Sequence, residues 1–169
     1  MRHTSLREYQ ENLAARLNTA KAADASETKL GMLVGADLWL VDLADVGEVI
    51  PVPELLAVPL TKHWFAGVAN IRGNLFSIVD FAAFMGGPAV ARNDQARLLL
   101  IAERHRVRSA LLVDRVVGLR RADQFRIQDA GEPLAPWELS RHIDTDNRKW
   151  RALNVDSLVR HPGFLQVEA

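Results

Sequence analysis

Two apolar runs separated by a short polar turn form the most regular pattern in the chain. They cover Phe65 to Ile71 and Leu75 to Phe81, with Arg72-Gly73-Asn74 between them. Glycine supplies the positive φ that tight hairpin turns need, and asparagine tolerates it. The stretch Trp64 to Phe81 therefore predicts a rigid β-hairpin with one charge, Arg72, at its tip. The nearly unbroken second run predicts a strand covered on both faces.

Shorter apolar runs predict two further strand pairs. Met32 to Val34 and Leu38 to Val41 flank the turn Gly35-Ala36-Asp37, which indicates a second hairpin. Arg97 to Ala102 and Val107 to Val113 flank a charged tip in the same way.

Proline and helical spacing mark the segments between these strands. Val41 to Val49 has the spacing of one or two helical turns. Three prolines, at positions 51, 53 and 59, then exclude a long central strand or helix and predict a loop or a broken edge strand. Apolar residues on such an edge are available at a surface and form a candidate contact patch. They are Leu55, Leu56, Val58 and Leu60.

The last third of the chain is less regular. Asp114 to Leu119 fits either a helical turn or the start of a strand, and the pattern leaves both open. Trp150 to Val159 predicts a strand entering a short helix, which His161-Pro162-Gly163 ends. The two halves of the chain share a loose order of hairpin, charged tip and Val-Asp pair, at Val79-Asp80 and Val113-Asp114. Many short strands with few helices favour small antiparallel β-barrels.

The first residues predict a helix followed by a linker. Ser5 and Glu8 have the spacing of a capping box, and apolar residues then recur at helical intervals at Leu6, Tyr9, Leu13 and Leu17. Such a helix either packs on its own domain or docks a partner, and the stripe alone does not decide. Lys21 to Thr28 is small and polar, typical of a linker.

Composition narrows the class of partner. The 169 residues contain 49% hydrophobic side chains, and Lys plus Arg equals Asp plus Glu at 21 each. Zero formal net charge argues against nucleic acid or an anionic membrane as the main partner and leaves little repulsion against self-association in larger assemblies. No stretch approaches the roughly 20 apolar residues that a membrane helix needs, and no secretory leader is recognised, so we expect a cytoplasmic protein.

No motif for catalysis, cofactor binding or metal binding is found. The sequence lacks cysteine, and its five histidines are not at metal-ligand spacing, so we expect neither a metal site nor a cofactor. The common nucleotide-binding and hydrolase motifs are absent, and we expect no enzyme activity.

A basic cluster supports one alternative function. Arg104, Arg106 and Arg108 could contact phosphates, which would make the protein a small β-barrel RNA-binding module. The cluster lacks interleaved aromatic residues on which bases would stack, and its arginines fit solvent-facing positions on a hairpin better.

The central hairpin resembles a known family. Gly67-Val-Ala-Asn70-Ile-Arg72-Gly73 followed by Ile78-Val79-Asp80 is similar to the G-V-x-N-L-R-G…V-V-D motif of CheW-type chemotaxis adaptors. Val41 to Ile50 and Leu111 to Val116 resemble two other segments of that family, so the resemblance covers roughly Leu30 to Val159. WFAGVANIRGNL and the N-terminal extension look most like adaptors of type IV pilus, or twitching motility, chemosensory systems.

The resemblance implies a mainly β fold of two SH3-like, five-stranded antiparallel β-barrel lobes packed side by side, with an N-terminal helix and short connecting helices. Residues 1–28 would form the helix and linker, and residues 29–169 the CheW-like domain. It also implies a non-catalytic scaffold that couples the cytoplasmic tip of a methyl-accepting chemoreceptor to the CheW-like regulatory domain of a CheA-type histidine kinase. Such an adaptor is cytoplasmic and recruited to membrane-associated receptor arrays.

The family also implies roles for individual residues. Arg72 would pair with Glu48 and shape a groove for the receptor tip; the alternative is that Arg72 only solvates its turn. The receptor-binding candidates are Val46, Glu48, Gly67, Asn70 and Arg72, although Val46 would serve equally well as a core residue. The kinase-binding candidates are Ile50, Val52, Leu55 and Val58, with core burial as the alternative. From their sequence positions alone, Asp80 and Asp114 are expected to cap local backbone donors at strand ends.

Overall fold

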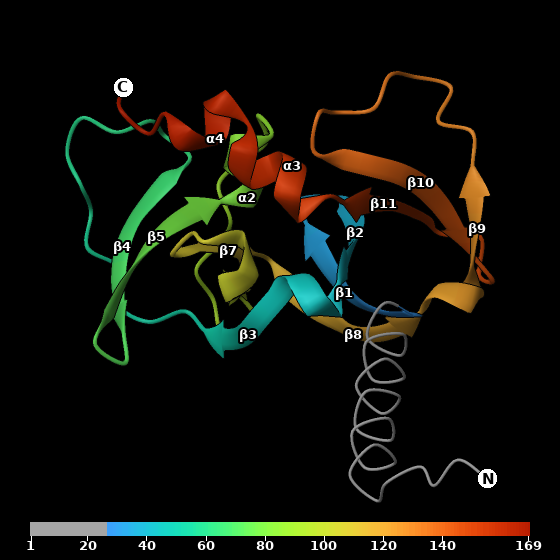
Figure 1. The fold of residues 1–169 in the computed structure, drawn as a ribbon, viewed down its shortest axis with the longest axis horizontal. Coiled ribbons are helices and arrows are strands. Elements are labelled where there is room, and N and C mark those ends of the chain that lie inside the picture. The colour runs from blue at the N-terminus through green and yellow to red at the C-terminus, as the bar shows by residue number, and fades with distance from the viewer. Residues whose placement is uncertain (1–26) are drawn as a thin grey trace, which may run out of the picture.

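The computed structural model describes residues 27–169, in two lobes joined side by side (Figure 1). The predicted helix after Ser5 and most of the linker lie outside the described residues. The strands are β1 (Thr28–Val34), β2 (Asp37–Asp42), β3 (Val46–Pro51), β4 (Phe65–Ile71), β5 (Asn74–Asp80), β6 (Arg97–Ile101), β7 (Ser109–Val113), β8 (Arg115–Arg121), β9 (Phe125–Gln128), β10 (Glu138–Asp144) and β11 (Lys149–Leu153). The helices are α2 (Phe81–Phe84), α3 (Val155–Arg160) and α4 (Pro162–Leu165), with 3₁₀ turns η1 (Leu43–Asp45), η2 (Glu103–His105) and η3 (Ala122–Gln124).

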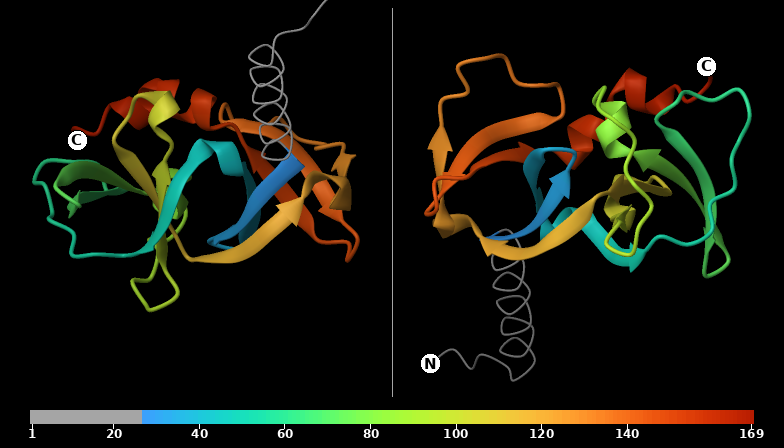
Figure 2. Two further views of the ribbon diagram at one scale, coloured as in Figure 1. Left: turned by 60° about the horizontal axis from the view of Figure 1, so that its bottom comes forward. Right: turned by 180° about the vertical axis from the view of Figure 1, so that it is seen from behind.

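Each lobe is built on one sheet. A five-stranded sheet has the order β3-β6-β7-β5-β4, and a six-stranded sheet has the order β8-β1-β2-β11-β10-β9. The mainly β class with two lobes and few short helices is confirmed, although one sheet has six strands where five were predicted. The lobes are not the two halves of the chain. The middle of the sequence forms the five-stranded sheet, while the strands before and after it in the chain, β1–β2 and β8–β11, form the other sheet. The chain then returns through α3 and α4, and its C-terminal tail lies against the five-stranded lobe (Figure 2).

Each sheet also contains one parallel pair, so neither is purely antiparallel. β2 pairs with β11, and β5 pairs with β7, both in parallel. The two Val-Asp pairs therefore lie at the ends of neighbouring strands in one sheet and do not mark equivalent places in two lobes. A parallel pair joins segments that are distant in the sequence, so no local pattern reveals it.

The lobes share one hydrophobic core. Trp39 on β2 meets Phe81 at the start of α2 edge to face, with ring centroids 5.3 Å apart, and both side chains are fully buried. Phe84 then contacts Trp137 and Phe164, which brings the β9–β10 connection and α4 into the same cluster. Large aromatic side chains bury on the order of 150–250 Å² each, so at about 25 cal/mol/Å² these contacts hold the lobes together as one body.

The β4–β5 hairpin forms as predicted, with a two-residue turn. Ile71 pairs with Asn74, and Arg72 and Gly73 between them have φ of 50° and 81°. Both central residues with positive φ define the type I′ turn that matches strand twist. Strand β5 is covered only in its second half, because Leu75 is exposed while residues 78–80 are buried.

The predicted cap of local backbone donors is confirmed for Asp80, whereas the donor to Asp114 comes from a distant segment. Asp80 accepts hydrogen bonds from Ala83 N (3.0 Å) and Val90 N (2.8 Å). Asp114 accepts one from Gly35 N (2.6 Å), which ties the end of β7 to the β1–β2 turn in the other lobe.

Two expectations between the hairpins change. The predicted helical turns in Val41 to Val49 shrink to the 3₁₀ turn η1, because β3 pairs with β6 and extends the backbone from Val46 onward. The segment Asp114 to Leu119, left open by the sequence, is strand β8. The edge strand predicted from the prolines is confirmed, because β3 lies at the edge of its sheet and ends at Pro51.

Candidate functional site

An ion pair at one end of the five-stranded lobe forms the centre of the candidate site. Arg72 Nη1 lies 3.3 Å from Glu48 Oε1, and Nη2 contacts Oε2, so the guanidinium and carboxylate face each other through two atoms each. Both side chains are exposed, at 65% and 42% of their surface. An exposed pair adds only about 0–1 kcal/mol to stability, so its main effect is to fix the relative position of the turn and β3.

A groove of about 360 Å³ opens beside this pair. Its apolar lining comes from buried or half-buried side chains: Ile71, Phe76, Leu100, Ile101 and Val107. Its other lining residues are exposed and mostly polar: Gly47, Glu48, Arg72, Asn74, Glu103 and Arg108. An apolar interior with a charged rim is the usual composition of a site that takes a side chain or a short segment of a partner.

The β6–β7 connection contributes one side of this groove, and sequence reasoning did not place it there. Glu103, Val107 and Arg108 all lie in this connection. In the sequence the basic cluster stands out only by its charge, whereas the fold gives its members different surroundings. Arg104 pairs with Asp45, Arg108 lines the groove, and Arg106 is exposed with φ of 57°.

Asp45 holds the β6–β7 connection in place. Its carboxylate contacts Arg104 and lies 2.7 Å from His105 Nε2, and its carbonyl oxygen accepts a hydrogen bond from Ala102 N at 2.9 Å. Only 8% of Asp45 is exposed. An acid within a mostly apolar segment, VDLADV, was the only sequence signal for this role.

The five predicted receptor-binding residues do not all meet at the groove. Glu48 and Arg72 line it together, and Asn70 holds the turn because its side-chain oxygen accepts a hydrogen bond from Gly73 N at 2.9 Å. Val46 is half-buried and packs on the core, as its alternative interpretation stated. Gly67 lies in β4 with φ of 123°, where an added Cβ would overlap the carbonyl of Leu56.

The predicted kinase-binding residues differ in exposure. Ile50, Val52 and Leu55 are half-buried and pack against the core, whereas Val58 is 39% exposed. Two neighbours in the same connection, Leu56 and Leu60, are more exposed, at 59% and 87%. Main-chain hydrogen bonds between Leu56 and Val68, and between Leu60 and Ala169, hold this connection against β4 and the C-terminal tail.

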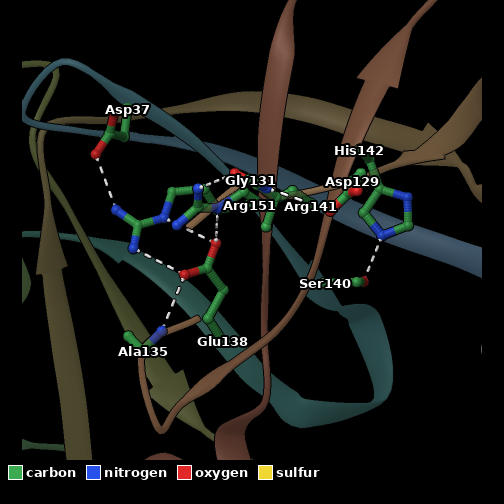
Figure 3. Close-up of polar contacts among 10 residues, drawn as sticks. Asp37, Asp129, Gly131, Ala135, Glu138, Ser140, Arg141, His142 and Arg151 are labelled. Atoms are coloured by element: carbon green, nitrogen blue, oxygen red, sulfur yellow. Dashed lines mark hydrogen bonds and ion pairs between the residues drawn. The ribbon is translucent and has the colours of Figure 1, made fainter. Parts of the chain in front are cut away.

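A buried polar cluster in the six-stranded lobe is a structural anchor. Figure 3 shows the carboxylate of Glu138 facing the guanidinium groups of Arg141 and Arg151; Arg141 Nε is 2.8 Å from one carboxylate oxygen, and Arg151 Nη2 is 3.0 Å from the other. Burial acts to raise the pKa of Glu138, but hydrogen bonds from Arg151, Arg141 and Ala135 N outweigh it and lower the pKa to about 2. Arg151 also reaches Asp37, which joins β11 to the β1–β2 turn.

Other chemistry is sparse within residues 27–169. The pKa of His142 is lowered by burial and by the charge of Lys29, and its Nε2 lies 2.7 Å from Ser140 Oγ. No three potential metal ligands gather anywhere in this range. Among the described helices, none has the length and apolar character needed to cross a membrane.

Comparison with known proteins finds a family and relatives that match most of this chain. Residues 30–163 match the family described as CheW-like domain. The chain is 31% identical over 160 residues to Protein PilI of Pseudomonas aeruginosa, covering 92% of this chain and 88% of that protein. It is 25% identical over 121 residues to chemotaxis protein CheW of Thermotoga maritima, covering 70% and 78%.

A solved structure shares the fold. The crystal structure of the scaffolding protein TtCheW from Thermoanaerobacter tengcongensis aligns with a TM-score of 0.65 at 16% identity, covering 82% of this chain and 95% of that chain. The family match spans most of the sequence, and the similarity to PilI extends over most of both chains. The resemblance read from the central hairpin is thereby confirmed, and the chain belongs to the CheW-like domain family.

Proposed function

We propose that this protein is a non-catalytic scaffold that couples the cytoplasmic tip of a methyl-accepting chemoreceptor to a CheA-type histidine kinase. The observation that carries the proposal is the Arg72–Glu48 pair beside an apolar groove. A rigid two-residue turn and a bidentate pair present a fixed shape, which suits recognition. Membership of the CheW-like family supports the same function.

The receptor tip occupies the groove between β3, the β4–β5 turn and the β6–β7 connection. The groove can bury apolar side chains against Phe76 and Val107 while its charged rim stays in water. Asn70 and the Arg72–Glu48 pair hold the groove open in one shape.

The kinase's CheW-like regulatory domain binds the connection between β3 and β4. Within it, Leu56, Val58 and Leu60 expose apolar surface on a backbone that is held by hydrogen bonds, and such patches are typical of protein contacts. Ile50, Val52 and Leu55 support this surface from below by packing on the core.

The pathway we propose is the type IV pilus, or twitching motility, system. The support is the WFAGVANIRGNL stretch together with the similarity to PilI. In the cell the adaptor is cytoplasmic and joins membrane-associated receptor arrays, where it alternates with kinase domains and contacts further copies of itself.

A bridging experiment tests the coupling. A receptor tip fragment is immobilised and the kinase's CheW-like domain is added with and without the full chain. Retention of the kinase domain only when the full chain is present is the expected result. A chain that binds neither component, or only one of them, contradicts the proposal.

A further inference from the structure

The rim of the groove carries one anion and one cation that have no ionic partner among residues 27–169. Glu103 and Arg108 both line the groove and both are exposed. The other two rim charges, Glu48 and Arg72, neutralise each other. Within the described chain, no side-chain hydrogen bond or ion pair is found for Glu103 or Arg108, whereas Arg104 in the same connection is paired with Asp45.

We propose that Glu103 and Arg108 set the orientation of the receptor segment in the groove. The segment recognised carries a bulky apolar residue, which enters between Phe76 and Val107, with an acidic residue facing Arg108 and a basic residue facing Glu103. This inference rests on the proposed receptor function and specifies the chemistry of its ligand.

The backbone that carries both charges is fixed, which places the two side chains at defined points on the rim. The main chain at Arg108 is held because its carbonyl accepts a hydrogen bond from Ser77 N at 2.9 Å. Glu103 begins η2, whose position is set by the contacts of Asp45 with Ala102, Arg104 and His105. Because the backbone is already ordered, binding has to order only the two side chains and not the connection that carries them.

Opposite charges on one rim affect orientation more than affinity. A segment in the reverse direction would place its acid against Glu103 and its base against Arg108, and each like-charge contact weakens the wrong complex. A guanidinium also receives a carboxylate through two nitrogens, which fixes its angle of approach. The apolar groove lining alone would not distinguish the two directions.

The chain provides matched controls. Arg106 is an exposed arginine two residues before Arg108 that does not line the groove, and Glu132 is an exposed acid on the other lobe. Neither Arg106 nor Glu132 belongs to an ion pair within the described range, and Glu132 interacts with Arg141 only electrostatically. Reversal of either charge therefore tests electrostatics without a contact in the groove. All four sites are on the surface, and we expect all four variants to keep wild-type thermal stability.

The experiment measures affinity for the receptor tip with Arg108→Glu, Glu103→Lys, Arg106→Glu and Glu132→Lys in the full chain. We expect about tenfold weaker binding for the first two and less than a twofold change for the controls. A charge-reversed tip, with the facing acid replaced by lysine, is expected to restore binding to Arg108→Glu. Equal effects of Arg108→Glu and Arg106→Glu overturn the inference. If the wild-type chain still binds the tip in that case, the proposed function stands. Failure of the wild-type chain to bind the tip overturns both.

Discussion

Arg72 and Glu48 form an ion pair between strands that lie at opposite edges of one sheet. Glu48 is on β3 and Arg72 follows β4, and these are the first and last strands in the order β3-β6-β7-β5-β4. The sheet must therefore curl until its edges approach, and the pair marks where they do. The ion pair therefore lies at the mouth of the groove that we assign to the receptor tip.

Gly67→Ala is expected to disrupt the β3–β4 connection. The residue has φ of 123°, and a Cβ would overlap Leu56, so we expect a loss of about 2 kcal/mol or more in unfolding free energy. Urea denaturation measures this. Gly73→Ala is the matched control, because φ is 81° but nothing surrounds the site, and it should lose only about 1 kcal/mol. Equal losses for both would mean that the contact with Leu56 contributes nothing.

Asp45→Asn is expected to weaken receptor-tip binding through the shape of the groove. The variant removes the charge that holds Arg104 and His105, so the β6–β7 connection loses its anchor. We expect a several-fold loss of affinity, measured by titration calorimetry. Asp144→Asn, at a similarly buried carboxylate that contacts Arg148 and Trp150 in the other lobe, should lower stability without this loss. A comparable drop in affinity for both variants would refute a positioning role for Asp45.

Glu138 is expected to make the fold sensitive to acid. Its pKa is about 2 in the fold against an ordinary value of 4.5, so its stabilising contribution is complete above about pH 4.5 and is lost as the pH falls through about 2. Glu138→Gln leaves Arg141 and Arg151 without their buried partner and should cost about 3 kcal/mol at pH 7. The difference in unfolding free energy between the two proteins should stay constant from pH 7 to about pH 4.5 and shrink as the pH falls from there toward 2. A difference that stays constant below about pH 4.5 would contradict the shifted pKa.

Val58→Asp is expected to weaken binding of the kinase domain at least tenfold. The side chain is partly exposed in the connection that we assign to the kinase, so a charge there blocks apolar contact more than it disturbs the core. Surface plasmon resonance with the kinase's CheW-like domain measures the effect. Ile127→Asp places the same charge on β9 of the other lobe, where the side chain is 79% exposed, and serves as the control. Kinase binding that survives Val58→Asp would locate the contact elsewhere.

The hairpins and caps could be predicted from the sequence because their causes are local. A glycine with positive φ, an alternation of apolar residues and an acid at a strand end each act over a few positions, and the β4–β5 turn and the cap at Asp80 formed as expected. The proposed pair of Arg72 with Glu48 came from family resemblance, and its geometry is present in the fold.

The features that could not be predicted from the sequence all depend on contacts between distant segments. The parallel pairing of β5 with β7 places both Val-Asp pairs in one sheet, and nothing local distinguishes this from two repeated halves. The exposure of Leu56 and the partial burial of Leu55 depend on which side of the connection faces β4. The role of Asp45 depends on the β6–β7 connection, which lies more than fifty residues further along the chain.

The most direct test of the central claim is the affinity of the receptor tip for Arg72→Glu, Glu48→Arg and the double variant with the charges exchanged. We predict that each single variant binds the tip at least tenfold more weakly, while its stability changes by less than about 1 kcal/mol. The double variant should recover much of the affinity because it restores the ion pair. Wild-type affinity in Arg72→Glu would contradict the account. Unfolding of that variant would show instead that the pair is structural.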